Sequence, residues 1–215
     1  AGADDYLAKP ATPNDLIARV DALLQKPKRV PEPAARNNIV SFLPTKGGLG
    51  TTALSVNTAL ELKRMYPAKQ VVLIELQEGG GTVAHQLGLK TSDGLHALLA
   101  TPLPQVTQNA VARHIVPTAT GLHVLLSAPV PRLTSNNIGT NYARTILSYL
   151  SATYTYVVVD LPASLDEGYA EALRMSAAII LTLGDDRISH ALALGFTNRY
   201  ANLTHVLGRG RGAPQ

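Results

Sequence analysis

The most specific chemical signal in the sequence is a glycine-rich stretch that reads Lys46-Gly47-Gly48-Leu49-Gly50-Thr51-Thr52. It follows an apolar run at 39–43 and precedes a helical pattern at 52–66. A phosphate-binding loop has this setting, because its glycines let backbone N–H groups converge and the helix offers unpaired N–H groups to an anion. We therefore predict that residues 47–52 bind the phosphates of a nucleotide, with the Thr52 hydroxyl on Mg²⁺. A glycine-rich turn without a ligand is the alternative interpretation.

One position of this loop departs from the usual order of a phosphate-binding loop, G-x-x-x-x-G-K-[ST]. Thr51 occupies the position of the lysine, and the basic residue comes earlier, as Lys46. A unit charge pair 4 Å apart has a gross interaction of roughly 4 kcal/mol at an effective dielectric constant of about 20. A net loss of about 3 kcal/mol in the transition state slows a reaction on the order of a hundredfold. We therefore expect hydrolysis of a bound nucleotide to be slow or absent.

Two further apolar runs end in polar residues that could serve the same site. The run at 70–76 is followed by Gln77, and the run at 155–161 contains Asp160 near its end. Ligands of open α/β sheets lie beyond the carboxyl ends of the strands, where these side chains would meet the loop. We predict that Asp160 holds Mg²⁺ through a water molecule, opposite Thr52. Gln77 can orient a water molecule but cannot accept its proton as a carboxylate does.

Both assignments have an alternative. An aspartate at the end of a strand, such as Asp160, often caps the helix that follows. Gln77 could equally be a solvated residue at a strand end.

Apolar runs alternate with helical patterns from residue 38 onward. The predicted strands span 39–43, 70–76, 122–127, 155–161 and 177–183. The predicted helices span 52–66, 92–100, 103–113, 134–151, 165–175 and 188–204. Strands that are apolar almost throughout and are separated by helices indicate a parallel sheet covered on both faces. The predicted fold class is α/β, a doubly wound, mostly parallel sheet with helices on both faces.

Composition excludes several classes of site and partner. The chain has 215 residues, is 46% hydrophobic and contains no cysteine, which rules out disulfides, thiolate metal sites and a cysteine nucleophile. No apolar run approaches the ~20 residues of a membrane span. The formal net charge is +4, but much of the basic excess lies in segments 26–37 and 208–215, so we do not expect a nucleic-acid partner. We expect a cytoplasmic protein.

The first residues differ in character from the rest. Residues 1–25 read as a short strand closed by Lys9-Pro10 and then a helix that is apolar on one face. Residues 26–37 carry three prolines, which favour an extended linker. We therefore predict a separate segment at 1–25, a linker at 26–37, an α/β domain at 38–207 and a disordered tail at 208–215.

The glycine-rich loop resembles the deviant Walker A loop of the MinD/ParA ATPases, whose core reads K-G-G-x-G-K-[ST]. Lys46 matches the signature lysine of that family, and Thr51 departs at its second lysine. A threonine there, together with Glu-Leu-Gln-x-Gly-Gly at 75–80, is similar to the TadZ/CpaE branch of pilus assembly proteins. Residues 1–25 resemble the end of a response-regulator receiver domain, which also precedes the ATPase in CpaE proteins.

The resemblance implies a P-loop NTPase fold and a homodimer held by bound ATP and Mg²⁺. In such a dimer Lys46 would reach across to the partner's phosphates. The family carries D-x-D at the positions of residues 75–77, where its second aspartate orients the attacking water, and Gln77 takes that position here. The resemblance implies at most a slow ATPase.

The same resemblance implies a role in localising and assembling Flp/Tad pili, with pilus assembly proteins as partners. The protein would be recruited from the cytoplasm to the inner face of the cell membrane or to a cell pole. Two alternatives stay open. One is an active ATPase of the ParA or MinD kind that acts in DNA or septum positioning. The other is a scaffold that binds partner proteins without nucleotide.

Overall fold

The computed structural model describes residues 38–90, 92–129, 138–164 and 166–206. The predictions of a receiver-like segment at 1–25, a linker at 26–37 and a tail at 208–215 lie outside these residues. The α/β domain predicted from residue 38 onward lies almost wholly within them.

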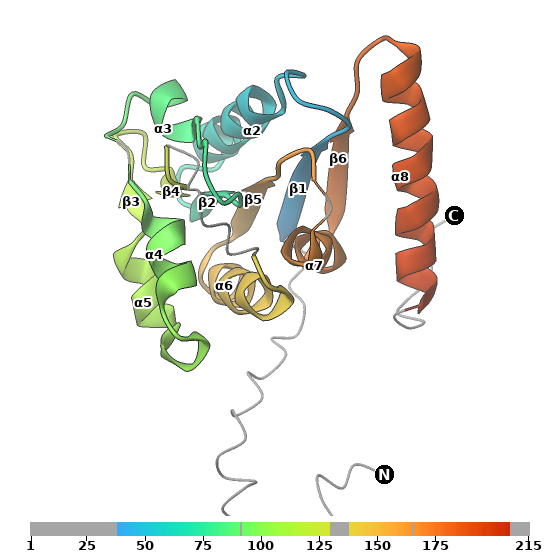
Figure 1. The fold of residues 1–215 in the computed structure, drawn as a ribbon. Helices are drawn as coiled ribbons and strands as arrows, with labels where there is room; N and C mark the ends of the chain where they lie inside the picture. Colours follow the sequence, from blue (N-terminus) through green and yellow to red (C-terminus); the bar gives the residue numbers. More distant parts are fainter. Residues whose placement is uncertain (1–37, 91, 130–137, 165, 207–215) are drawn as a thin grey trace, which may run out of the picture. The chain divides into compact units, whose positions relative to one another are not determined.

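The described residues form one six-stranded sheet in the order β3-β4-β2-β5-β1-β6 (Figure 1). Its strands are β1 (Ile39–Pro44), β2 (Val71–Glu75), β3 (Val116–Pro117), β4 (His123–Leu125), β5 (Tyr156–Asp160) and β6 (Ala178–Thr182). Every neighbouring pair is parallel except β3 and β4, which are antiparallel. The prediction of a mostly parallel sheet is confirmed. The two-residue strand β3 was not predicted, because so short a segment has no periodicity to recognise.

Helices cover both faces of the sheet, as predicted (Figure 1). They are α2 (Thr51–Met65), α3 (Val83–Gln86), α4 (Gly94–Ala100), η1 (Leu103–Gln105), α5 (Gln108–Arg113), α6 (Thr140–Thr153), α7 (Glu167–Met175) and α8 (Arg187–Val206). Helices α2 and α3 share one buried cluster with the sheet, and α4, α5, α6 and α7 share the other. No helix within these residues is long and apolar enough to cross a membrane.

The central strands are apolar along most of their length because each supplies both clusters. In β5, Val157 and Val159 belong to the cluster on the α6 side, and Val158 belongs to the cluster on the α2 side. Successive side chains of a strand point to opposite faces, so a strand buried on both faces is apolar at most consecutive positions. The carboxyl end of β5 is thereby placed at the centre of the sheet, between β2 and β1.

Two helix predictions need correction. The helix predicted at 103–113 is divided into η1 and α5, because Thr107 caps α5 by accepting the N–H of Ala110 at 3.2 Å. The helix predicted from residue 134 is seen as α6, which begins at Thr140; residues 138–139 before it are not helical, and residues 134–137 lie outside the described ones. The short helix α3 was also missing from the predicted helices.

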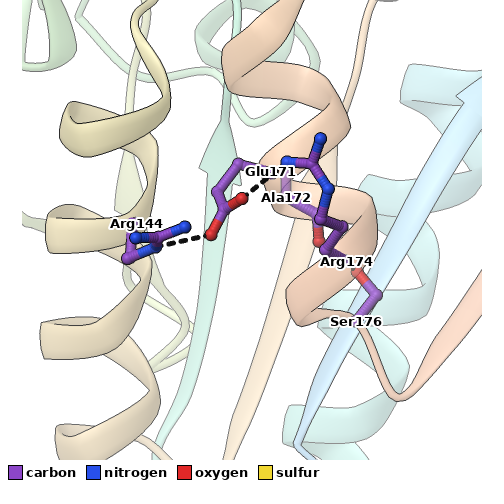
Figure 2. A network of polar contacts seen from close by, with 5 residues as sticks. All are labelled: Arg144, Glu171, Ala172, Arg174 and Ser176. Atoms are coloured by element: carbon purple, nitrogen blue, oxygen red, sulfur yellow. Dashed lines mark hydrogen bonds and ion pairs between the residues drawn. The ribbon is translucent and has the colours of Figure 1, made fainter. Parts of the chain in front are cut away.

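A buried carboxylate joins α6 to α7 (Figure 2). Glu171 of α7 has a side chain that is only 5% exposed, and it accepts from Arg144 Nε of α6 and from Arg174 Nη1 of α7, both at 2.7 Å. A charged group that is buried this deeply requires partners of this kind. The pairing therefore links α7 to α6 on the face of the sheet that both helices cover.

We predict that Glu171→Gln lowers the free energy of unfolding by about 2 kcal/mol, because an amide N–H₂ group would face a guanidinium in a buried position. Glu61→Gln is the matched control, since Glu61 also pairs with an arginine, Arg64, but on the exposed surface of α2. That change should have a much smaller effect. Urea unfolding of the three proteins measures the difference. Equal losses in both variants would contradict the role assigned to Glu171.

Candidate functional site

The glycine-rich loop joins the carboxyl end of β1 to the first turn of α2. Gly48 and Gly50 adopt positive φ angles of 81° and 74°, which side chains rarely tolerate. Gly50 is the N-cap of α2, no side chain caps that end, and the first turn contains no acidic residue. A Cβ atom built on Gly47, Gly48 or Gly50 would meet no heavy atom within 4 Å. The loop therefore has open space beside its backbone, next to helix N–H groups without side-chain acceptors, and this arrangement fits a phosphate.

Thr52 and Asp160 meet directly beneath this loop. Thr52 Oγ1 donates a hydrogen bond to Asp160 Oδ2 at 2.8 Å, although the two residues are 108 positions apart in the chain. Ser55 Oγ donates to Asp160 Oδ1 at 3.0 Å, so both carboxylate oxygens have a hydroxyl partner. Ser55 was not among the predicted site residues. Its spacing of three positions from Thr52 puts both hydroxyls on one side of α2, and this spacing is the signal that could have identified it.

Burial makes the charge on Asp160 unfavourable. Asp160 is 3% exposed, and burial raises the pKa of its carboxyl to about 6, against the lowering effect of the hydrogen bonds from Thr52 and Ser55. The negative charge of Glu75 raises this pKa further. A divalent cation beside Asp160 would stabilise the ionised form. The residue is therefore a carboxylate whose charge is better compensated when a cation is present.

The protein supplies only part of a metal coordination sphere here. Within the described ranges there is no group of three or more His, Cys, Asp or Glu residues that could hold a metal ion. Mg²⁺ retains several waters and commonly takes one or two protein oxygens together with phosphate oxygens. The hydroxyl of Thr52 and the carboxylate of Asp160 fit that donor set.

Thr51 lies at the start of α2 with its side chain directed to the sheet. The residue is buried, and its hydroxyl forms a short hydrogen bond with the hydroxyl of Thr182 at the end of β6. Thr51 thus ties the start of α2 to β6 and brings no positive charge to the loop.

Lys46 forms an ion pair within its own chain. Its Nζ lies 2.7 Å from Oδ2 of Asp186, in the connection between β6 and α8. Asp186 also accepts hydrogen bonds from the backbone N–H and the hydroxyl of Ser189 in the first turn of α8. These bonds, with that from Lys46 the largest, hold the pKa of the Asp186 carboxyl well below its usual range. The side chains of Lys46 and Asp186 are 41% and 38% exposed, so the pair lies at the surface.

Gln77 lies at the carboxyl end of β2, half-buried. Its side-chain Nε2 is 3.4 Å from Oε1 of Glu75, and its carbonyl accepts a hydrogen bond from Ser127 Oγ at 2.6 Å. Among the described residues no hydrogen bond joins Gln77 to the loop at 46–52. The structure therefore places Gln77 at the predicted edge of the sheet, where its hydrogen bonds go to Glu75 and Ser127.

No protein-family model matches this sequence, and no curated protein matches it. Solved structures do match the fold. The chain is similar to the kinase domain of the Escherichia coli tyrosine kinase ETK, with a TM-score of 0.60, 17% identity and coverage of 88% of this chain and 69% of that chain. It is similar to a ParA family ATPase from Chlorobium tepidum TLS, with a TM-score of 0.61, 17% identity and coverage of 81% and 70%.

A third similar structure is the septum site-determining protein MinD from Pyrococcus horikoshii OT3, which was solved in complex with Mg-ADP. Its TM-score is 0.55 at 16% identity, with coverage of 76% of this chain and 65% of that chain. Identities this low establish the fold alone. The described domain therefore has the fold of the MinD and ParA type of P-loop ATPases, which confirms the predicted fold.

We predict that Asp160→Asn stabilises the nucleotide-free protein at neutral pH. The pKa of Asp160 is raised from 3.8 to about 6, so the native state binds the extra proton, and stability falls as pH rises from about 4 to about 6. Removal of the carboxylate should add about 2–3 kcal/mol at pH 7 and close to nothing near pH 4.

Asp166→Asn is the matched control, because Asp166 is an exposed residue at the N-cap of α7 whose side chain makes no capping hydrogen bond. Chemical unfolding from pH 4 to 7 measures all three proteins. Parallel stability curves for wild type and Asp160→Asn would contradict the buried charge.

Proposed function

We propose that this protein binds Mg-ATP through residues 47–52 and uses the nucleotide to hold a homodimer. The observation that carries the proposal is the hydrogen bond between Thr52 and Asp160 beneath an open glycine loop at the carboxyl edge of a parallel sheet. Nucleotides bind at this edge in α/β proteins of this kind. The solved MinD structure of similar fold, which contains Mg-ADP, gives further support.

Different groups of the site would bind the phosphates and the metal ion. The backbone N–H groups of residues 47–52 and of the first turn of α2 would receive the phosphates. Thr52 and Asp160 would hold Mg²⁺, with Asp160 acting through a water molecule. Bound Mg²⁺ supplies positive charge that offsets the charge of the phosphates. None of these contacts requires a lysine at position 51.

Lys46 is proposed to act between the two subunits. The side chain of Lys46 lies at the surface, where it pairs with Asp186. Because surface ion pairs contribute little to stability, Lys46 can leave Asp186 for another anion at little cost in free energy. In the dimer Lys46 would exchange Asp186 for the phosphates bound by the partner subunit. Asp186 would remain tied to α8 through Ser189.

Hydrolysis is proposed to be slow. Thr51 is buried against Thr182 and brings no charge to the phosphates, and Gln77 offers an amide where a carboxylate would accept a proton. The bound nucleotide would then act as a long-lived signal for the dimeric state. At most the protein is a slow ATPase.

The biological role we propose is localisation and assembly of Flp/Tad-type pili, with pilus assembly proteins at the inner membrane as partners. Its support is the resemblance of the loop, of residues 75–80 and of residues 1–25 to TadZ/CpaE proteins. A protein of this kind needs a nucleotide-controlled dimer more than rapid turnover. Turnover that DNA or membrane stimulates strongly would favour an active ATPase of the ParA or MinD kind instead.

We predict that Gly50→Val weakens Mg-ATP binding on the order of a hundredfold. A side chain at this position fills the space beside the loop and removes about two charge-assisted hydrogen bonds to phosphate, each contributing about 1.5 kcal/mol or more. Isothermal titration calorimetry measures the affinity.

Gly88→Val is the matched control for that variant. Gly88 also has a positive φ angle, 62°, and open space around it, so the backbone strain is similar and the position is outside the loop. Both variants should lose similar stability, and only Gly50→Val should lose nucleotide. Equal Mg-ATP affinities in the two variants would refute the site.

We predict that Lys46→Ala abolishes ATP-dependent dimers while the monomer keeps its affinity for Mg-ATP within about threefold, because the lysine contacts the partner's nucleotide and not its own. Light scattering with and without ATP measures the dimer. Lys90→Ala, at an exposed lysine outside the loop, should dimerise as wild type does.

Asp186→Asn separates the two contacts of Lys46. It weakens the ion pair but leaves the lysine in place, and asparagine can still cap α8. Its ATP-dependent dimers should be at least as abundant as those of wild type. If Lys46→Ala forms as many ATP-dependent dimers as wild type, the proposed contact between subunits is wrong.

A further inference from the structure

Glu75 is a buried carboxylate that accepts hydrogen bonds from three backbone N–H groups. It is the last residue of β2 and is 1% exposed. Its Oε1 accepts from Thr82 at 2.6 Å and from Val83 at 3.0 Å, and its Oε2 accepts from Ser127 at 3.2 Å. The first two donors begin α3, and the third follows β4. One side chain thus connects three separate parts of the chain.

Two more hydrogen bonds fix the same region. Ser127 Oγ donates to the carbonyl of Gln77 at 2.6 Å, and the N–H of Gly81 donates to the carbonyl of Ala128 at 3.0 Å. The segment from Gln77 to Val83 is therefore attached to residues 127–128 at two points, with the Glu75 carboxylate between them. Carboxylates that accept backbone N–H groups make stronger hydrogen bonds than neutral acceptors do.

Gly81 leaves the space that the Glu75 carboxylate occupies. A Cβ atom on Gly81 would lie 2.4 Å from Oε2 and 2.8 Å from Cδ of Glu75, so the Glu75 carboxylate would have to move away from its present position. Its φ angle lies outside the left-handed region, so the backbone itself would accept alanine. The three heavy atoms nearest to such a Cβ atom all belong to Glu75.

The segment held in this way lies next to the proposed nucleotide site. Glu75 is paired in register with Asp160 of β5, and the N–H of Leu76 donates to the carbonyl of Asp160 at 3.0 Å. Gln77 follows directly. A change in the position of segment 77–83 would thus move Gln77 relative to Asp160. This segment follows β2, whereas Lys46 follows β1 on the other side of β5.

We propose that Glu75 is a positioning residue that holds segment 77–83 where it meets the phosphate end of the bound nucleotide. The inference rests on the proposed function for the identity of the ligand. Within the part of the chain that the structure describes, the hydrogen bonds of the Glu75 side chain come from Gln77, Thr82, Val83 and Ser127, and none comes from the loop at 46–52. Loss of Glu75 should therefore loosen segment 77–83 and leave the phosphate-binding loop intact.

Two substitutions disturb this arrangement from opposite sides. Glu75→Gln keeps the shape of the side chain but turns one acceptor oxygen into an N–H₂ group, which then faces either Ser127 or the pair Thr82 and Val83. Gly81→Ala leaves Glu75 chemically unchanged and forces its carboxylate away from those donors. Glu171→Gln is the matched control, because Glu171 is a buried glutamate of the same domain that lies on α7.

Hydrogen–deuterium exchange followed by mass spectrometry tests the proposal on the nucleotide-free protein. Peptides that cover 77–84 and 126–129 should exchange about tenfold faster or more in both Glu75→Gln and Gly81→Ala, because backbone N–H groups lose charged acceptors. Peptides of β1 and α2 should be unchanged. Glu171→Gln should leave segment 77–84 as it is in wild type. Equal protection of this segment in Glu75→Gln and wild type would overturn the positioning role.

A second measurement separates positioning from a merely structural role. In wild type, Mg-ATP should slow exchange of segment 77–83 further. In Glu75→Gln, the affinity for Mg-ATP should stay within about threefold of wild type, while this additional protection is lost. Retained protection, or a loss of affinity as large as that of Gly50→Val, would overturn the proposal. A wild type that binds no Mg-ATP overturns the proposed function instead, and the exchange of the nucleotide-free proteins still reports whether Glu75 holds the segment.

Discussion

The buried carboxylate of Asp160 is the group around which the described domain is arranged. It ends β5, the strand that lies between β2 and β1. It accepts from Thr52 and Ser55 of α2, and its carbonyl accepts from Leu76 beyond β2. Helix α2, strand β5 and the chain after β2 are thus held together by one residue. Any shift of Asp160 would move the loop at 46–52 and the segment at 77–83 relative to each other.

The buried Asp160 carboxylate and the glycine loop lower the free energy of unfolding of the domain. Favourable contacts elsewhere in the domain offset this loss. Burial of the Asp160 carboxylate raises the free energy of the folded state, and so does the fixed backbone of the glycine loop. The compensation comes from the two apolar clusters on the faces of the sheet and from ion pairs such as that of Glu171. Functional sites commonly depart from the most stable local arrangement in this way.

Sequence patterns were sufficient for most of the fold. The apolar runs at 39–43 and 155–161 correspond to β1 and β5, because strands buried on both faces have a distinctive composition. The meeting of Thr52 with Asp160 could also be predicted, since parallel strands bring their carboxyl ends to one edge. The break between η1 and α5 was missed, because the apolar pattern at 103–113 continues across it and only the capping role of Thr107 marks it.

The finer contacts of the site could not be predicted from sequence. Lys46 and Asp186 are 140 positions apart, and Glu75 and Ser127 are 52 apart. No periodicity relates such residues, since their contact depends on loops whose course is set by the whole domain. Sequence patterns placed Glu75 only within the predicted strand at 70–76 and at the first position of the D-x-D comparison. Its role as an acceptor depends on N–H groups at the start of α3 and after β4, so it can be recognised only from the folded structure.

The contact between Glu75 and Gly81 constrains how this protein can change by mutation. A side chain at position 81 cannot coexist with the present Glu75 carboxylate, and a shorter or uncharged residue at position 75 leaves buried N–H groups without acceptors. An aspartate at position 75 would have one methylene less, which frees space beside residue 81 but shortens the reach to Thr82 and Ser127. The effects of substitutions at the two positions are therefore not additive. Related chains should vary at these positions jointly, with glycine at the second wherever glutamate occupies the first.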